Sequence, residues 1–217
     1  MQQRRLSQRC LVIAHSALPF FAASLFAPSL FAAEPVAAGP RHATPAEAFD
    51  AFRAAAQKED WQTALKSCAT RLQDHLIVSN VRIGYRIADY GDQHHKPGFE
   101  ALLRRHVPRL DEWKQELRTK ATAENREPLA AELAAKIRDN AADKPALLAE
   151  LFAWLGKLGV DHGLPAGGVV DAQLSNLAID GQRAKAVALS KDEKGTIEFP
   201  IEFIREAHGW RLMLPEL

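Results

Sequence analysis

Apolar and polar residues alternate along the C-terminal part of the chain, from Gly167 to Leu217. Between Thr196 and Phe203 every second residue is apolar, and most of the residues between them are acidic or small. A period of two predicts a strand with one buried and one wet face, as in an antiparallel sheet. The same pattern predicts a last strand from Trp210 to Leu214. Pro200 has no N–H to donate, so it should face an edge or a bulge of the sheet.

Two weaker strands are predicted before these. In the first, the apolar positions change phase at Ser175-Asn176, which predicts a β-bulge and a bend in the sheet. Asp180-Gly181 then predicts a type I′ hairpin turn, in which both central residues need a positive φ. The strand after the turn, Arg183 to Ser190, is rich in alanine. Four consecutive antiparallel strands with a bulge predict a curved sheet whose apolar face needs a cover.

The sequence before the sheet has helical periodicity. Thr44 is a predicted N-cap, and Glu47 completes a capping box with it. Asp60 caps a second helix, and a third, longer helix is expected from Thr70 to about Tyr90. The predicted fold class is therefore α+β, with N-terminal helices packed on a curved four-stranded antiparallel C-terminal sheet.

This succession of elements resembles the NTF2-like superfamily of cone-shaped, cystatin-like α+β domains, and in particular its uncharacterised secreted bacterial members. The resemblance rests on the cap at Thr44-Pro45, the helix start at Asp60-Trp61, the long third helix and a meander ending in Gly209-Trp210-Arg211-Leu212. These are patterns of shape, not of chemistry. They imply a curved sheet wrapped around the long helix, with a conical cavity between them. The residues expected to line that cavity are Ile83, Ile87, Phe199, Phe203 and Trp210.

The middle of the chain is longer than this resemblance accounts for. Four further helices are expected there: Pro97–His106, Pro108–Ala123, Glu127–Asn140 and Asp143–Leu158. We interpret residues 92–163 as a helical insertion in a single domain of residues 44–217. Its second and third helices have narrow apolar stripes, which suit a helical hairpin packed on itself or on a partner. We expect this hairpin to be an appended lid or docking surface that contributes few large side chains to the core.

The N-terminal residues 1–33 have the composition of a secretory signal peptide. Three arginines precede an apolar run from Leu11 to Ala33, which ends in small residues. The alternative is an uncleaved membrane anchor, the only membrane association that the sequence indicates. Residues 34–43 are rich in Pro, Ala and Gly and are expected to form a linker. The predicted location is therefore periplasmic or extracellular.

Charge and cysteine content narrow the classes of function. Removal of residues 1–33 leaves 25 basic and 27 acidic residues, because that segment contains three arginines and no acidic residue. No basic surplus of the kind typical of nucleic-acid-binding proteins remains. Removal also leaves Cys68 as the one cysteine, without an intrachain partner. Cys68 shares a helix face with Trp61 and Leu65, which predicts a buried thiol.

No motif in the sequence prescribes a particular chemistry. His94 and His95 are adjacent and should point in different directions, and no metal-ligand spacing occurs, so neither a metal site nor a cofactor is expected. Tyr85 and Asp89, on the long helix near the expected cavity, are weak candidates for proton transfer. Hydrogen bonding at the rim of the cavity and pairing of Asp89 with Arg86 are the alternative.

Two hypotheses for function follow from the sequence. In the first, the protein is an exported non-catalytic NTF2-like domain that binds a small apolar ligand or a protein partner. In the alternative, it is a small isomerase or hydrolase that uses the cone-shaped pocket. Convergent polar groups in an open pocket would favour the enzyme. Whether the protein forms a homodimer is left open.

Overall fold

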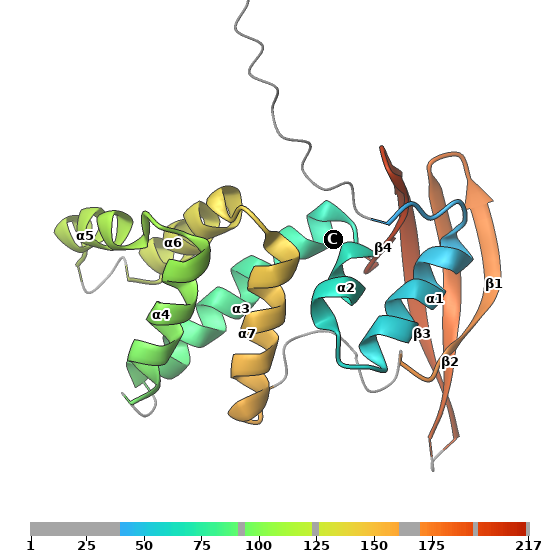
Figure 1. The fold of residues 1–217 in the computed structure, drawn as a ribbon, viewed down its shortest axis with the longest axis horizontal. Helices are drawn as coiled ribbons and strands as arrows, with labels where there is room; N and C mark the ends of the chain where they lie inside the picture. Colours follow the sequence, from blue (N-terminus) through green and yellow to red (C-terminus); the bar gives the residue numbers. More distant parts are fainter. Residues whose placement is uncertain (1–39, 91–93, 123–125, 161–169, 193–194, 216–217) are drawn as a thin grey trace, which may run out of the picture. The chain divides into compact units, whose positions relative to one another are not determined.

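The computed structural model describes residues 40–90, 94–122, 126–160, 170–192 and 195–215, and within these ranges seven helices precede a four-stranded antiparallel sheet (Figure 1). The predicted α+β fold class is therefore confirmed. The helices are α1 (Pro45–Ala56), α2 (Trp61–Lys66), α3 (Thr70–Tyr90), α4 (His95–His106), α5 (Leu110–Lys120), α6 (Arg126–Asn140) and α7 (Lys144–Lys157). The strands are β1 (Gln173–Asp180), β2 (Arg183–Asp192), β3 (Gly195–Glu206) and β4 (Gly209–Met213). The predicted signal peptide, residues 1–33, lies outside the described residues.

The first two helices begin at their predicted caps. The hydroxyl of Thr44 accepts a hydrogen bond from the backbone N–H of Glu47 at 3.2 Å, and the carboxylate of Glu47 accepts one from Ala43 N–H at 2.7 Å. Asp60 accepts a hydrogen bond from the N–H of Thr63 at 3.1 Å. These side chains satisfy N–H groups that have no partner within the first turn of a helix.

The sheet has the strand order β1-β2-β3-β4 and contains the predicted bulge. The register between β1 and β2 shifts between Ser175 and Ala178, and Asn176 has a φ of 54°. The β1–β2 turn differs from the prediction. Asp180 pairs with Arg183, so the two turn residues are Gly181 and Gln182, and of these Gly181 has a positive φ of 56°. Glycine at the first turn position is typical of a type II′ turn, not of type I′.

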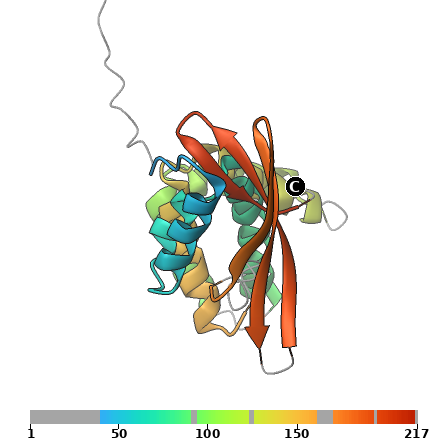
Figure 2. The same cartoon turned by 90° about the vertical axis from the view of Figure 1, so that its right-hand side faces the viewer.

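One face of the sheet, which we call the inner face, packs against α1 (Figures 1 and 2). Directly paired residues point to the same side, so Ala184, Phe203 and Leu212 share this face. All three are buried, and the small side chains of β2 leave room for a helix to approach. The C-terminal half of α1 is held to the beginning of the sheet segment by Arg53 Nε, which donates to Val170 O at 3.2 Å.

The long helix α3 meets the sheet at its N-terminal end. Ala69 N–H donates to Leu212 O of β4 at 2.8 Å, one residue before α3 begins. From there α3 leads away from the sheet and packs against α4, α6 and α7 (Figure 1). The resemblance implied that the sheet wraps around this long helix. In the structure α1 lies on the inner face instead, because α3 buries its apolar side chains among helices.

The four helices expected between residues 92 and 163 are present as α4 to α7, with ends within a few residues of the prediction. The hairpin of α5 and α6, however, contributes large side chains to the core, contrary to expectation. Leu110, Trp113, Leu117, Leu133 and Ile137 are all buried, and they belong to the same apolar cluster as the sheet residues. Since α6 packs along α3, the apolar stripes of the hairpin are used for packing within the domain.

Candidate functional site

Tyr85 lies within the helical bundle, not beside the sheet. Its ring meets Phe99 of α4 edge-on, with ring centres 5.1 Å apart, and Phe99 packs in turn against Trp154 of α7 at 4.8 Å. This arrangement of rings is favourable in itself. Tyr85 is therefore part of the packing between α3, α4 and α7. The side chain of Asp89, the other predicted candidate, lies outside the described residues.

The five residues expected to line one cavity are divided between two regions. Ile83 and Ile87 lie far along α3, since at ~1.5 Å per residue Ile83 is about 20 Å from Thr70, where α3 meets β4. Phe203 and Trp210 are buried on the inner face of the sheet, and Phe199 is partly buried there. The structure thus gathers three of the five residues and leaves the two isoleucines in the helical bundle.

The inner face extends beyond the part that is buried. Leu177 and Ile179 of β1 are 39% and 57% exposed, and Ile197 near the tip of the β2–β3 hairpin is 40% exposed. Ile179 pairs with the buried Ala184, and Leu177 lies two residues before it, so both are on the inner face. We call Leu177 and Ile179 the uncovered strip. It continues the buried apolar face out to the edge strand.

Two exposed arginines lie at the end of the sheet that carries the uncovered strip, one on each face. Arg183 begins β2 and Arg205 lies near the end of β3, where its N–H donates to Gln182 O at 2.8 Å. Both side chains are exposed, and among the described residues neither has an ion-pair partner. Lys185, on the opposite face, pairs with Glu202 at 3.2 Å. Arg205 pairs with Trp210 and so lies on the inner face, whereas Arg183 pairs with Ile204 and lies on the opposite face. Among the described residues, Arg205 is therefore the unpaired positive charge on the face of the uncovered strip.

The two sheet edges are unsuited to the addition of another strand. The bulge at Ser175–Ala178 interrupts β1, which is one edge. On the other side, β4 pairs with residues 202–206 of β3 only, so the first half of β3 extends beyond it. Pro200 lies in that half, opposite Val187 of β2. Its position agrees with the prediction that it faces an edge, where the missing N–H disfavours further pairing.

A buried polar cluster that was not predicted lies along the edge of β4 that faces away from β3. It consists of His42, Ser67 and Arg211, and the Nε2 of His42 is 3.1 Å from Ser67 Oγ. Trp210 N–H donates to His42 O at 3.0 Å, and Leu212 N–H donates to Ser67 O at 2.9 Å. His42 was assigned to the linker of residues 34–43, but it is fixed to the sheet. A histidine in a Pro- and Ala-rich segment gives no sign of this pairing.

The environment of the cluster keeps His42 and the neighbouring Cys68 neutral. Burial lowers the pKa of His42, the charge of Arg211 lowers it further, and Glu47 partly opposes the shift. Burial raises the pKa of the Cys68 thiol to about 12, and the thiol is buried as predicted. The distance from His42 to Ser67 would suit a base and a nucleophile. Because both side chains are buried, we interpret the pair as an anchor for the N-terminal segment.

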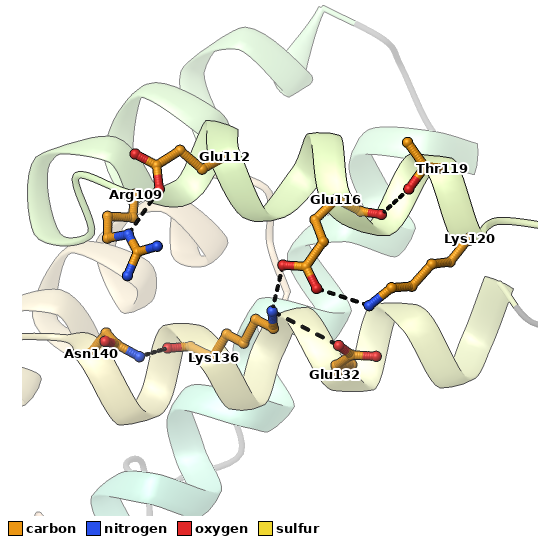
Figure 3. Close-up of polar contacts among 8 residues, drawn as sticks. All are labelled: Arg109, Glu112, Glu116, Thr119, Lys120, Glu132, Lys136 and Asn140. Carbon is orange, nitrogen blue, oxygen red and sulfur yellow. Dashed lines mark hydrogen bonds and ion pairs between the residues drawn. The ribbon is translucent and has the colours of Figure 1, made fainter.

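Charged side chains on the surface of the α5–α6 hairpin form a network of ion pairs (Figure 3). Glu116 accepts hydrogen bonds from Lys120 at 2.8 Å and Lys136 at 2.9 Å, which lower its pKa to about 2. Lys136 also lies 3.9 Å from Glu132. Exposed pairs of this kind contribute little to stability individually. Glu116, Lys120 and Lys136 are therefore engaged with one another.

The described residues contain no group of three potential metal ligands, and His95 lies edge-on to Trp154 with ring centres 6.5 Å apart. None of the helices in these ranges has the length and apolarity needed to cross a membrane. No protein-family model matches the chain, and no curated protein or solved structure is significantly similar to it. Membership of the NTF2-like superfamily therefore stays a prediction.

Proposed function

We propose that this protein is an exported, non-catalytic domain of the NTF2-like type that binds a partner protein through the uncovered strip of its sheet. The observation that carries the proposal is the exposure of Leu177 and Ile179, 39% and 57%, beside the buried part of the inner face. Apolar side chains that continue a core out to the surface are typical of interaction sites. Export is inferred from the sequence of residues 1–33.

A protein partner suits this strip better than a small apolar ligand. Small-ligand sites are concave and enclose roughly 70–90% of the ligand surface. The uncovered strip lies on an edge strand, where Ile179 is more than half exposed. Arg205, which shares the inner face and has no ion-pair partner among the described residues, favours a segment that combines apolar and acidic residues. Because both sheet edges disfavour strand addition, we expect this segment to pack on the face.

The alternative hypothesis, a small isomerase or hydrolase, has less support. It placed Tyr85 and Asp89 beside a cavity at the sheet, but Tyr85 packs against Phe99 in the helical bundle. The histidine–serine contact in the β4 cluster is buried, so a substrate could not reach it without local opening. No arrangement of the described side chains favours a particular reaction.

Site-specific crosslinking tests the proposal. A photo-crosslinking residue would replace Ile179 in the full chain, produced in cells that export it. A matched control would replace Lys185, whose side chain is 76% exposed on the opposite face. We expect a discrete adduct with one protein from position 179 and none from position 185. The partner, once identified, should bind the purified protein at least tenfold more weakly after Ile179→Ser, and Lys185→Ser should leave the affinity unchanged.

Other outcomes would overturn this assignment. Equal crosslinking from both positions would mean that the strip is not a specific site. An adduct with a second copy of the chain would indicate a homodimer interface. Saturable binding of a fatty acid that protects position 179, without any protein adduct, would favour the small apolar ligand.

A further inference from the structure

Arg211 is a buried cation without a direct counter-ion among the described residues. Its side chain is on the face of β4 opposite Trp210 and Leu212, and the residue is only 5% exposed. A guanidinium has five N–H donors. In the described part of the chain Arg211 makes one hydrogen bond, from Nη1 to Trp210 O at 3.2 Å, and no carboxylate lies within ion-pair distance. A buried charge is normally paired, because its transfer from water is unfavourable.

The nearest acidic group is engaged elsewhere. Glu206 acts on Arg211 electrostatically, but its Oε1 accepts a hydrogen bond from Thr70 N–H at 2.9 Å. Its other oxygen accepts from the Thr70 hydroxyl at 3.4 Å, so both oxygens cap the start of α3. The other neighbours are neutral, since burial keeps the Cys68 thiol protonated and lowers the pKa of His42. Arg211 therefore retains donors without a partner among the described residues, and these nitrogen atoms are not sealed from solvent.

We propose that Arg211 is the centre of a binding site for a small carboxylate, at the junction of β4, the segment around His42 and the residues before α3. A planar carboxylate matches the two parallel N–H donors of a guanidinium. A singly charged anion fits better than a doubly charged phosphate, because Glu206 already offsets part of the positive charge. The site is separate from the uncovered strip, so it does not depend on the proposed partner protein.

The test measures thermal unfolding of the full chain in sodium acetate and in sodium phosphate, against sodium chloride at equal ionic strength. Acetate should raise the unfolding temperature in a saturable way, and phosphate should have a smaller effect. Arg211→Met, which keeps an unbranched chain of similar length, should abolish the acetate effect. Arg205→Met, which removes an exposed arginine on the neighbouring strand, should leave it intact. If Arg211→Met does not fold, Arg211→Lys can be used instead, because it keeps the charge but lacks the two parallel N–H donors of a guanidinium. Arg211→Lys should weaken acetate binding at least tenfold.

Three results would overturn the proposal. One is the absence of a saturable acetate effect in the unmodified chain. Another is an unchanged acetate effect in Arg211→Met or, where that variant does not fold, in Arg211→Lys. The third concerns the side-chain carboxylate of Glu216, which follows Arg211 closely in sequence. If acetate acted only after Glu216→Gln, the occupant would be the chain's own carboxylate and not a free ligand.

Discussion

The helical bundle of α3 to α7 and the sheet with α1 differ in how completely they bury their apolar side chains. In the bundle, large residues such as Phe99, Leu103 and Ile137 are fully buried. The large apolar residues that remain exposed in the described ranges, Leu177, Ile179 and Ile197, are all in the sheet. The helices surround one another, whereas α1 alone cannot cover a four-stranded face. The difference shows that, within the described residues, the sheet is the part of the domain with large exposed apolar side chains.

The distribution of charge pairs supports the same distinction. Helices α4 to α7 carry several ion pairs, among them Arg104 with Asp111 at 2.8 Å and Lys136 with Glu116 at 2.9 Å. Within the described strands, Lys185 with Glu202 is the ion pair. The bundle thus differs from the sheet in having more of its charges paired and none of the large exposed apolar residues of the described ranges. We therefore expect the bundle to stabilise the domain and the sheet to bind.

The largest change in stability is expected from removing a buried aromatic ring in each region. These two variants also test whether the sheet and the bundle unfold as one cooperative unit. Trp210→Ala in the sheet and Phe99→Ala in the bundle should each lower the free energy of unfolding by about 3–5 kcal/mol, since both remove a buried aromatic ring. The core is continuous across both regions. We therefore expect a single unfolding transition in each variant, measured by calorimetry and by circular dichroism.

Two separate transitions in either variant would show that the sheet and the bundle fold independently. A loss below about 1 kcal/mol for Trp210→Ala would contradict its placement on the buried face of β4.

A smaller loss is expected at the contact between α3 and α4. A Cβ added at Gly84 would lie 2.3 Å from the ring of Phe99, so the two helices can approach only because this residue is glycine. Gly84→Ala should lower the free energy of unfolding by about 1–3 kcal/mol through overpacking. The matched control is Gly156→Ala in α7, where a Cβ would meet nothing within 4 Å. That change should stabilise the protein by about 0.5–1 kcal/mol, because alanine favours helix. Denaturant titrations with effects of the same sign would contradict this account of Gly84.

Local patterns in the sequence predicted most of the elements of this fold. The alternation around Phe203, the phase change at Ser175-Asn176 and the cap at Thr44 each act over a few residues, and the structure has all three. The hairpin turn was displaced by one residue. Either Asp180 or Gln182 could have shared the turn with Gly181, and strand pairing decided between them.

Contacts between distant segments could not be predicted in the same way. The pairing of His42 with β4 depends on Gly209, whose φ is 109° and where a Cβ would lie 2.3 Å from His42 O. Nothing near His42 in the sequence indicates this contact. The course of α3 was also missed, because its apolar positions would suit a sheet and a helical bundle equally well. Consequently Ile83 and Ile87 were assigned to a cavity beside the sheet.

Lowering the pH should destabilise the contact of His42 with Ser67, which holds the N-terminal segment beside β4. Because burial and Arg211 lower the pKa of His42 in the folded state, the unfolded chain takes up the proton first as the pH falls below about 6.5. The contribution of His42 to stability is therefore complete above that pH, decreases below it, and levels off below the folded pKa. Glu47 moderates the effect. His42→Gln should flatten this part of the stability profile, and His208→Gln, in the exposed β3–β4 turn, should not. Equal profiles for the two variants would contradict this role of His42.

The smallest change in stability is expected at Ile179, the most exposed of the large apolar residues in the sheet. Ile179 in the sheet is 57% exposed, whereas Ile137 in the bundle is fully buried. Ile179→Gln should alter the free energy of unfolding by no more than about 0.5 kcal/mol, as exposed substitutions usually do. Ile137→Gln should cost more than about 2 kcal/mol, because it removes buried apolar surface and encloses a polar amide. Binding of an apolar dye to the native protein should decrease with Ile179→Gln, since this residue is part of the uncovered strip. A loss of stability at Ile179 comparable to that at Ile137 would mean that the strip is already covered within the domain and is not available to a partner.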